Sequence, residues 1–377
     1  MPVLVKRLKL WHRVALVVGV MGAATVLCAA LLLQTKNAAI GDAAKERMGV
    51  AYLEPLRQLR ERLPVYRRAA EAGGDAGGLA QRREAVETAL ARLDEVDRRL
   101  GHALGSTEDF VRVSSEWQRY RTASDPRTAR DVYARLDQGL RALNLLVGDS
   151  SNLILDPALD SYYLMDAVLL TLPKAAGLLN EVIDSAGSSP SGTKPRTSEG
   201  IAALLNDTVE SVATNYRVAT GYNPALKAGL DAPWREYQTN AAATLAALSD
   251  TARGDRSAPA AAASRARVAL EANFKLFDAT LPMLDRLLEQ RVSQLTASKT
   301  PVVLVVVVGL VSGVLLALWT VRGAANTPAT TPVADPGPVL AGGPSIDRPA
   351  RVEKVTEENQ RLKFLVAELM LERRSPE

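Results

Sequence analysis

Histidine and cysteine are almost absent from this chain of 377 residues, which contains two histidines and one cysteine. With only His12 and His102, neither a zinc cluster nor a Ser-His-Asp catalytic arrangement is credible. The sequence also lacks a glycine-rich phosphate-binding loop. The single cysteine, Cys28, excludes a disulfide within one chain. We therefore expect no enzymatic activity, no catalytic residues, no metal site and no cofactor.

Charge is missing from two apolar stretches, residues 14–35 and 300–321. Each reaches the length of about 20 apolar residues that a helix needs to cross a bilayer, so we predict two transmembrane helices. A cleaved signal peptide is the alternative for the first stretch. That stretch is longer than the apolar region of a typical signal peptide, and Leu27 stands before Cys28, where cleavage requires a small residue.

The flank of the first stretch is basic, with Lys6, Arg7, Lys9 and Arg13 and no acidic residue before Asp42. The positive-inside rule then places residues 1–13 in the cytoplasm, 36–299 in the periplasm and the remainder, from 322, in the cytoplasm. The chain is thus predicted to be a two-pass protein of a bacterial inner membrane. Its net charge of +4 is small for this length and predicts no nucleic-acid partner.

Aromatic residues are few, at 5% of the chain, and no segment alternates as a strand does. Residues 81–100 instead place Val86, Ala89, Leu93, Val96 and Leu100 on one helical face. The fold class is therefore all-α. Glycine and proline clusters divide residues 36–299 into helices of roughly 20 to 40 residues, and the outermost two continue into the membrane spans. We expect an antiparallel helical bundle, either a single one with long helices or two stacked bundles.

The richest segment is the motif LDPALDSYYLMD of residues 155–166, which Leu172 and Pro173 follow. Asp156 suits a helix N-cap and Asp160 the first turn. Two interpretations remain open for its polar and aromatic residues: helix caps with core aromatics, or a ligand site suited to a cationic amine. The candidate residues are Asp156, Asp160, Tyr162, Tyr163 and Asp166. A second candidate group, Arg60 and Arg67 with Arg57 and Arg68, predicts either an anion site between helices or a solvated basic face.

This motif resembles the periplasmic sensor domain of bacterial methyl-accepting chemotaxis receptors and membrane-bound sensor histidine kinases. The resemblance covers about residues 1–321, and its further matches are Arg47, Gly49, Val50, Tyr52, Leu53, Pro55, Leu56, Leu100, Trp117 and residues 151–155. One departure is Tyr66, Arg67 and Arg68, where relatives often carry His-Arg-Gly. The resemblance implies a homodimeric sensor that detects a small periplasmic ligand or a binding protein and passes a signal across the membrane.

The C-terminal part is different in composition. Residues 322–350 are rich in proline and predict a disordered linker. Residues 351–373 return to a helical pattern that predicts a parallel two-stranded coiled coil or a lone amphipathic helix. The predicted dimerisation seam consists of Val352, Val355, Asn359, Leu362, Val366 and Leu369. This tail also resembles the zipper region of the small subunit of insertion-sequence transposases.

No signal-relay module, methyl-accepting hairpin or kinase follows the second span, unlike in the proteins that the motif resembles. We therefore expect signalling through a cytoplasmic partner or through mixed assemblies with full-length receptors. Two alternatives are a membrane-tethered scaffold protein and a truncated fragment of a chemoreceptor or histidine kinase.

Overall fold

A computed structural model describes residues 10–155, 158–186, 196–253 and 257–325. Every regular element in these residues is helical, which confirms the predicted all-α class. The chain divides into two compact units, Met1–Val321 and Arg322–Glu377, and the account below concerns the first. Asp156, most of the predicted linker and the whole predicted coiled coil lie outside the described residues.

Ten α-helices, a π-helical segment and two short 3₁₀ turns make up the described part of the chain. Their bounds are α1 Leu10–Glu71, α2 Ala76–Leu104, α3 Thr107–Thr122, α4 Pro126–Ser150, η2 Leu153–Leu155, α5 Leu159–Asp166, η3 Ala167–Thr171, α6 Leu172–Ser185, α7 Ser198–Tyr222, η4 Pro224–Leu226, α8 Lys227–Ala252, α9 Ala258–Ala297 and α10 Lys299–Ala325.

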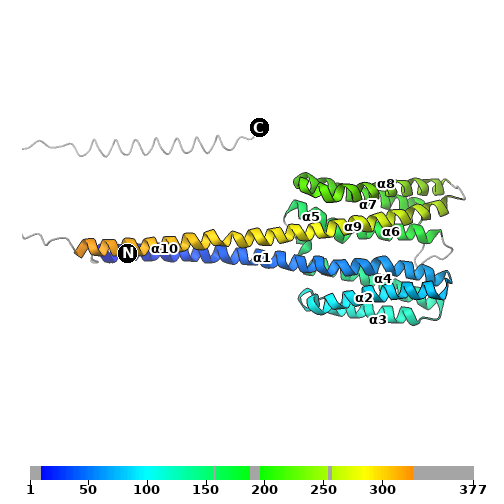
Figure 1. The fold of residues 1–377 in the computed structure, drawn as a ribbon, viewed down its shortest axis with the longest axis horizontal. Helices are drawn as coiled ribbons and strands as arrows, with labels where there is room; N and C mark the ends of the chain where they lie inside the picture. Colours follow the sequence, from blue (N-terminus) through cyan, green and yellow to red (C-terminus); the bar gives the residue numbers. More distant parts are fainter. Residues whose placement is uncertain (1–9, 156–157, 187–195, 254–256, 326–377) are drawn as a thin grey trace, which may run out of the picture. The chain divides into compact units, whose positions relative to one another are not determined.

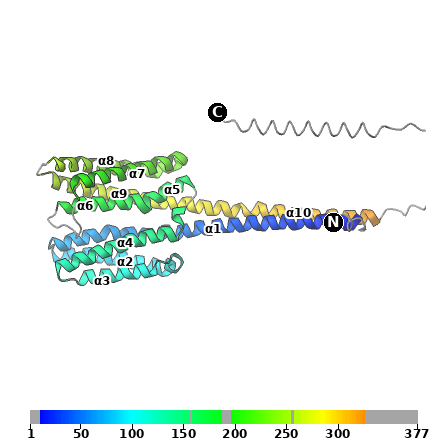
Figure 2. The same ribbon diagram turned by 180° about the vertical axis from the view of Figure 1, so that it is seen from behind.

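The helices form two four-helix bundles that lie side by side (Figures 1 and 2). In the first bundle, α1 contacts α2 and α4, and α3 contacts the same two helices; in the second, α6, α7, α8 and α9 contact one another in the same cyclic order. Helices α1 and α9 also contact each other across the junction of the bundles. Of the two arrangements that the sequence left open, the described residues thus form two bundles rather than one, and each bundle contains one of the two long helices.

Helix periodicity and capping explain the first bundle. Val86, Ala89 and Leu93 are fully buried on the inner face of α2, as their spacing predicts. Asp125 caps α4 by accepting the Thr128 backbone N–H at 2.7 Å, ahead of a proline at the first helical position. Helix α2 ends at Gly105, whose φ of +64° is readily adopted only by glycine. Gly105 lies outside the glycine and proline clusters from which the other loops are predicted.

Three helical stretches are long and apolar enough to cross a membrane: Leu16–Glu71, Leu159–Ser185 and Ala258–Leu316. The most apolar part of Leu159–Ser185 is mostly buried among neighbouring helices, whereas the most apolar parts of the other two stretches are exposed. Exposed leucines and valines on this scale fit a membrane environment. Both stretches continue a bundle helix, since α1 runs unbroken for 62 residues and α10 follows α9 after Ser298 alone.

The motif segment lies where the chain crosses from the first bundle to the second. Helix α5 begins at Leu159 with Ala158 in the cap position, which is later than the Asp156 cap predicted from the sequence. Asp160 does lie in the first turn, as predicted. Between α5 and α6 the backbone forms the π-helical segment η3, an irregularity that is frequent at functional sites.

Candidate functional site

A cleft of about 1060 Å³ lies between the two bundles. Helices α1 and α4 line it from the first bundle, and η3, α6, α7 and α9 line it from the second. This volume is at the upper end of the range for small-molecule sites, which are typically about 300 to 1,000 Å³. Because its walls belong to different bundles, any molecule that occupies the cleft contacts both.

Leucines and phenylalanines give the cleft a large apolar surface. Leu145 of α4, Leu170 of η3 and Leu204 of α7 keep 46%, 39% and 37% of their surface exposed there. Phe274 and Phe277 of α9 add two aromatic rings. Exposed apolar groups in a concave site are typical of a surface that binds an apolar ligand.

Five basic and three acidic side chains also line the cleft, and nearly all of them are paired. Arg57 pairs with Glu61 and with Asp278 of α9, and Arg141 pairs with Asp137 on its own helix. Lys174 and Arg196 pair with Asp207 and Glu181. Asp184 pairs with two arginines of α1.

Arg60 is the exception. Within the described residues, it is the one basic side chain of the cleft that forms neither a hydrogen bond nor an ion pair. Burial lowers the pKa of Arg60 from its ordinary value, and among its neighbours Asp137 opposes this effect while Arg141 adds to it. Because Asp137 already accepts from Arg141, this side of the cleft keeps an uncompensated positive charge.

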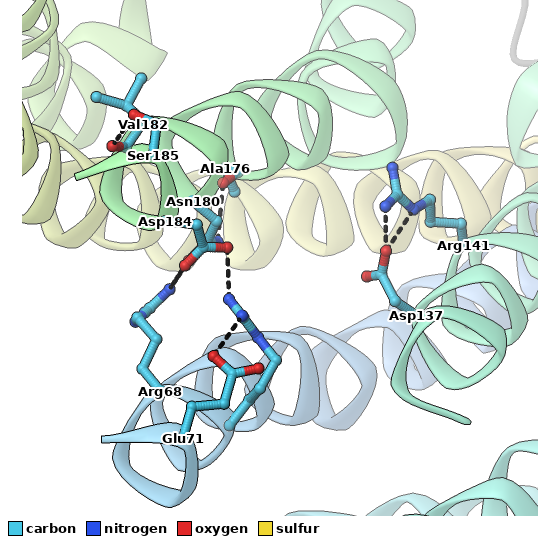
Figure 3. Close-up of polar contacts among 10 residues, drawn as sticks. Arg68, Glu71, Asp137, Arg141, Ala176, Asn180, Val182, Asp184 and Ser185 are labelled. Atoms are coloured by element: carbon cyan, nitrogen blue, oxygen red, sulfur yellow. Dashed lines mark hydrogen bonds and ion pairs between the residues drawn. The ribbon is translucent and has the colours of Figure 1, made fainter. Parts of the chain in front are cut away.

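Arg67, the other arginine singled out from the sequence, does not line the cleft. It is 4% exposed, pairs with Asp184 of α6 and with Glu71, and lies over the Tyr133 ring at 4.9 Å. Arg68 reaches the same carboxylate at 3.3 Å and donates to Asn180 at 2.8 Å (Figure 3). These contacts join the end of α1 to α6, so Arg67 holds the two bundles together at the end of the cleft.

The backbone is irregular on both walls of the cleft. Pro64 lies inside α1 and has no N–H, so the Arg60 carbonyl loses its donor within the helix. On the opposite wall, the Leu169 carbonyl of η3 accepts a hydrogen bond of 2.9 Å from buried Asn144 of α4. This bond links the two bundles through a side chain that also lines the cleft.

The described candidate residues of the motif, Asp160, Tyr162, Tyr163 and Asp166, lie on α5, and none of them lines the cleft. Asp160 accepts from Asn223 at 3.1 Å, and Asp166 accepts from Asn215 of α7. Tyr162 and Tyr163 pack edge to face with ring centroids 5.3 Å apart, and Tyr162 is partly exposed. Both carboxylates therefore accept hydrogen bonds from side chains of the second bundle. These bonds connect α5 to α7 and to the residue that follows it.

Polar contacts also connect α1 to α9 on the side of the cleft that faces the exposed apolar segments. Arg47 donates to both carboxylate oxygens of Asp285, at 2.7 and 3.0 Å. Arg291 of α9 lies 3.6 Å from Glu46 of α1 and donates to Ser161 of α5 at 2.7 Å. A change in the relative position of the bundles would therefore also displace the two helices that continue into the apolar segments.

Several residues of the cleft were not predicted from the sequence, among them Asn144, Leu170 and Phe274. Asn144 had a detectable signal, because it interrupts the apolar face formed by Leu140, Leu143 and Val147. In the part of the chain that the structure describes, no group of three or more histidine, cysteine or acidic residues is placed to hold a metal ion. No protein-family model, curated protein or solved structure matches the chain.

Proposed function

We propose that the chain is a sensor of the bacterial inner membrane that binds a small molecule in the cleft between its two bundles. It crosses the membrane twice, through the beginning of α1 and through α10, with both termini in the cytoplasm. The bundles then lie in the periplasm and signal without a catalytic output of their own. The basic N-terminal flank supports this orientation.

One observation carries the proposal: each bundle contains one of the two helices that continue into the exposed apolar segments. Helix α1 belongs to the first bundle and has a length of about 90 Å at 1.5 Å per residue. Helix α9 belongs to the second bundle and leads into α10. A ligand that contacts both bundles therefore acts on both helices at once.

Signalling requires that the ligand binds two arrangements of the bundles with different affinity, because a ligand with equal affinity for both shifts nothing. The polar contacts between the cleft walls support such a change of arrangement, because they are confined to a few places. These are Arg67 and Arg68 with Asp184 at one end, Arg57 with Asp278 of α9, and Asn144 with Leu169 within the cleft. Ligands that widen or narrow the cleft change the distance between α1 and α9.

The test measures the distance between the apolar segments of α1 and α10, which continue the two bundle helices. It uses the full chain, reconstituted in lipid nanodiscs. Cysteines replace Val20 in α1 and Leu316 in α10 in a Cys28→Ser background, and both receive spin labels for electron-electron double resonance. Labelled protein is diluted with unlabelled protein so that only distances within one chain contribute. A control pair at Arg98 and Arg119 lies within the first bundle.

We expect cleft ligands to shift the distance between positions 20 and 316 and to leave the control distance unchanged. Saturating ligand that leaves the 20–316 distance distribution unaltered would rule out transmission through these helices. A shift of both pairs would indicate a general loosening of the fold rather than signalling.

A further inference from the structure

We propose that the ligand of the cleft is a small organic monoanion, a carboxylate with an aliphatic or aromatic body, whose charged group pairs with Arg60. The inference rests on the proposed function for the role of the cleft as the ligand site. It adds the chemical class of the ligand and the residue that selects it.

The charge of the cleft argues for an anion. Each of the other four basic side chains has a carboxylate within 4 Å, whereas Arg60 has none within the described residues. A half-buried guanidinium that lacks both a partner and full hydration is destabilised in its charged form. A bound carboxylate removes this penalty, and its two oxygens match the planar fork of the guanidinium.

A second unused donor lies in the same cleft. Asn273 of α9 is 1% exposed, and its Nδ2 has no hydrogen-bond partner. The Tyr237 hydroxyl is its polar neighbour, but the two groups do not meet hydrogen-bond geometry. Buried amide donors are almost always satisfied in folded proteins, so an unused one in a site wall favours a ligand with acceptor atoms.

The balance of charge and apolar surface argues for a monoanion with a hydrocarbon body. One basic group is uncompensated, so a dianion such as phosphate would bring a second negative charge without a partner into a half-buried site. Leu170, Leu204 and Phe277 supply apolar contacts that inorganic anions cannot use. A cationic amine would instead meet the unpaired Arg60 and be repelled.

The experiment is isothermal titration calorimetry of the full chain in lipid nanodiscs. Nanodiscs are used because detergent monomers could fill the cleft. The probes are hexanoate and benzoate, with hexanamide, hexylamine and inorganic phosphate for comparison. The protein variants are Arg60→Gln, Arg60→Lys and a control, Arg98→Gln, whose exposed side chain pairs with Asp94 on α2 away from the cleft.

We expect both carboxylates to bind and the amide, amine and phosphate to bind at least tenfold more weakly. Arg60→Gln weakens carboxylate binding at least tenfold, Arg60→Lys weakens it less, and Arg98→Gln leaves it unchanged. Equal binding of hexanoate and hexanamide, unchanged hexanoate binding by Arg60→Gln, or no binding of either carboxylate at millimolar concentration overturns the proposal. If Arg60→Gln does not fold, the comparison of hexanoate with hexanamide on the unmodified chain decides.

The titration and the spin-label experiment separate the two proposals. Carboxylate binding that depends on Arg60 but does not change the 20–316 distance supports the ligand class and counts against a sensor. An amine that binds and changes that distance supports the sensor and refutes the ligand class.

Discussion

Arg67 of α1 and Asp184 of α6 form an ion pair that joins the two bundles at the end of the cleft. The pair lies between residues 117 positions apart in the sequence, and Arg68 shares the same carboxylate. Tyr133 of α4 covers the Arg67 guanidinium, so the contact combines three helices. The first prediction concerns this pair.

Replacing Asp184 with alanine leaves the buried Arg67 with Glu71 as its one remaining carboxylate. Removal of one partner of a buried ion pair destabilises by about 3 to 5 kcal/mol, and we expect the lower value because Glu71 remains. Thermal unfolding followed by circular dichroism measures the loss. Asp94→Ala, which breaks the exposed pair with Arg98, is the matched control and should change stability by less than about 1 kcal/mol. Equal effects of the two substitutions would contradict a role for Asp184 between the bundles.

Gly148 of α4 is a site where a side chain does not fit. A Cβ there would approach a Leu169 methyl group of η3 to 2.3 Å. Gly148→Ala should therefore destabilise the protein by about 1 to 3 kcal/mol through overpacking. Gly41→Ala is the control, because nothing lies within 4 Å of its position, and helix propensity predicts a gain of roughly 0.5 to 1 kcal/mol. In a double-mutant cycle, Gly148→Ala should cost less stability in a Leu169→Ala background than in the unmodified chain; an equal cost in both backgrounds would show that the close approach is not the cause.

Asn144 satisfies the Leu169 carbonyl in the irregular π-helical segment. Asn144→Leu keeps a similar volume but removes the donor, which should lower the free energy of unfolding by about 1 to 3 kcal/mol. Amide hydrogen exchange in η3 should accelerate at the same time. The exposed residue Asn206 bonds only to Glu210 of its own helix, so Asn206→Leu should leave both measurements unchanged.

Alkaline pH should destabilise the protein through two partly buried tyrosines, Tyr133 and Tyr216. Burial raises the pKa of Tyr133 and of Tyr216 to about 12, above the ordinary value of 10. Because the folded state retains these protons longer than the unfolded state, their contribution to stability is complete below pH 10 and is lost as the pH rises to 12. Phenolate absorbance and helix content measured together should change in this window.

The variant Tyr133→Phe removes one of these groups and should move the alkaline transition to higher pH. Tyr222→Phe, at an exposed position, should leave the transition where it is. If Tyr133→Phe reduces the phenolate absorbance that forms near pH 10 while the helix content is intact, the raised pKa of Tyr133 is contradicted.

The sequence predicted the helical class because Val86, Ala89 and Leu93 repeat at helical spacing, and the structure buries all three. It did not predict the turn at Gly105, because a single glycine is tolerated within a helical pattern and only its φ of +64° reveals the break. Whether the bundles stack or lie side by side depends on long-range packing, which periodicity alone does not encode.

The candidate site was partly predictable. The sequence placed Arg60 in a candidate group of four arginines with Arg57, Arg67 and Arg68, and nothing in the sequence distinguished it from the other three. What distinguishes Arg60 is that Asp184 pairs with Arg67 and Arg68, and Asp278 with Arg57, and these partners are contributed by α6 and α9. The motif residues Asp160 and Asp166 accept hydrogen bonds from Asn223 and Asn215. These partners lie 49 to 63 positions away in the sequence, so the local pattern does not reveal them.

Both helices that lead toward the apolar segments contain prolines in their interior. Pro55 and Pro64 lie inside α1, and Pro282 lies inside α9. Each removes one backbone hydrogen bond and makes its helix locally more compliant. In the proposed sensor, a ligand in the cleft would therefore bend these helices more readily than it shifts them along their axes. The signal would then cross the membrane as a change in the tilt of the two helices.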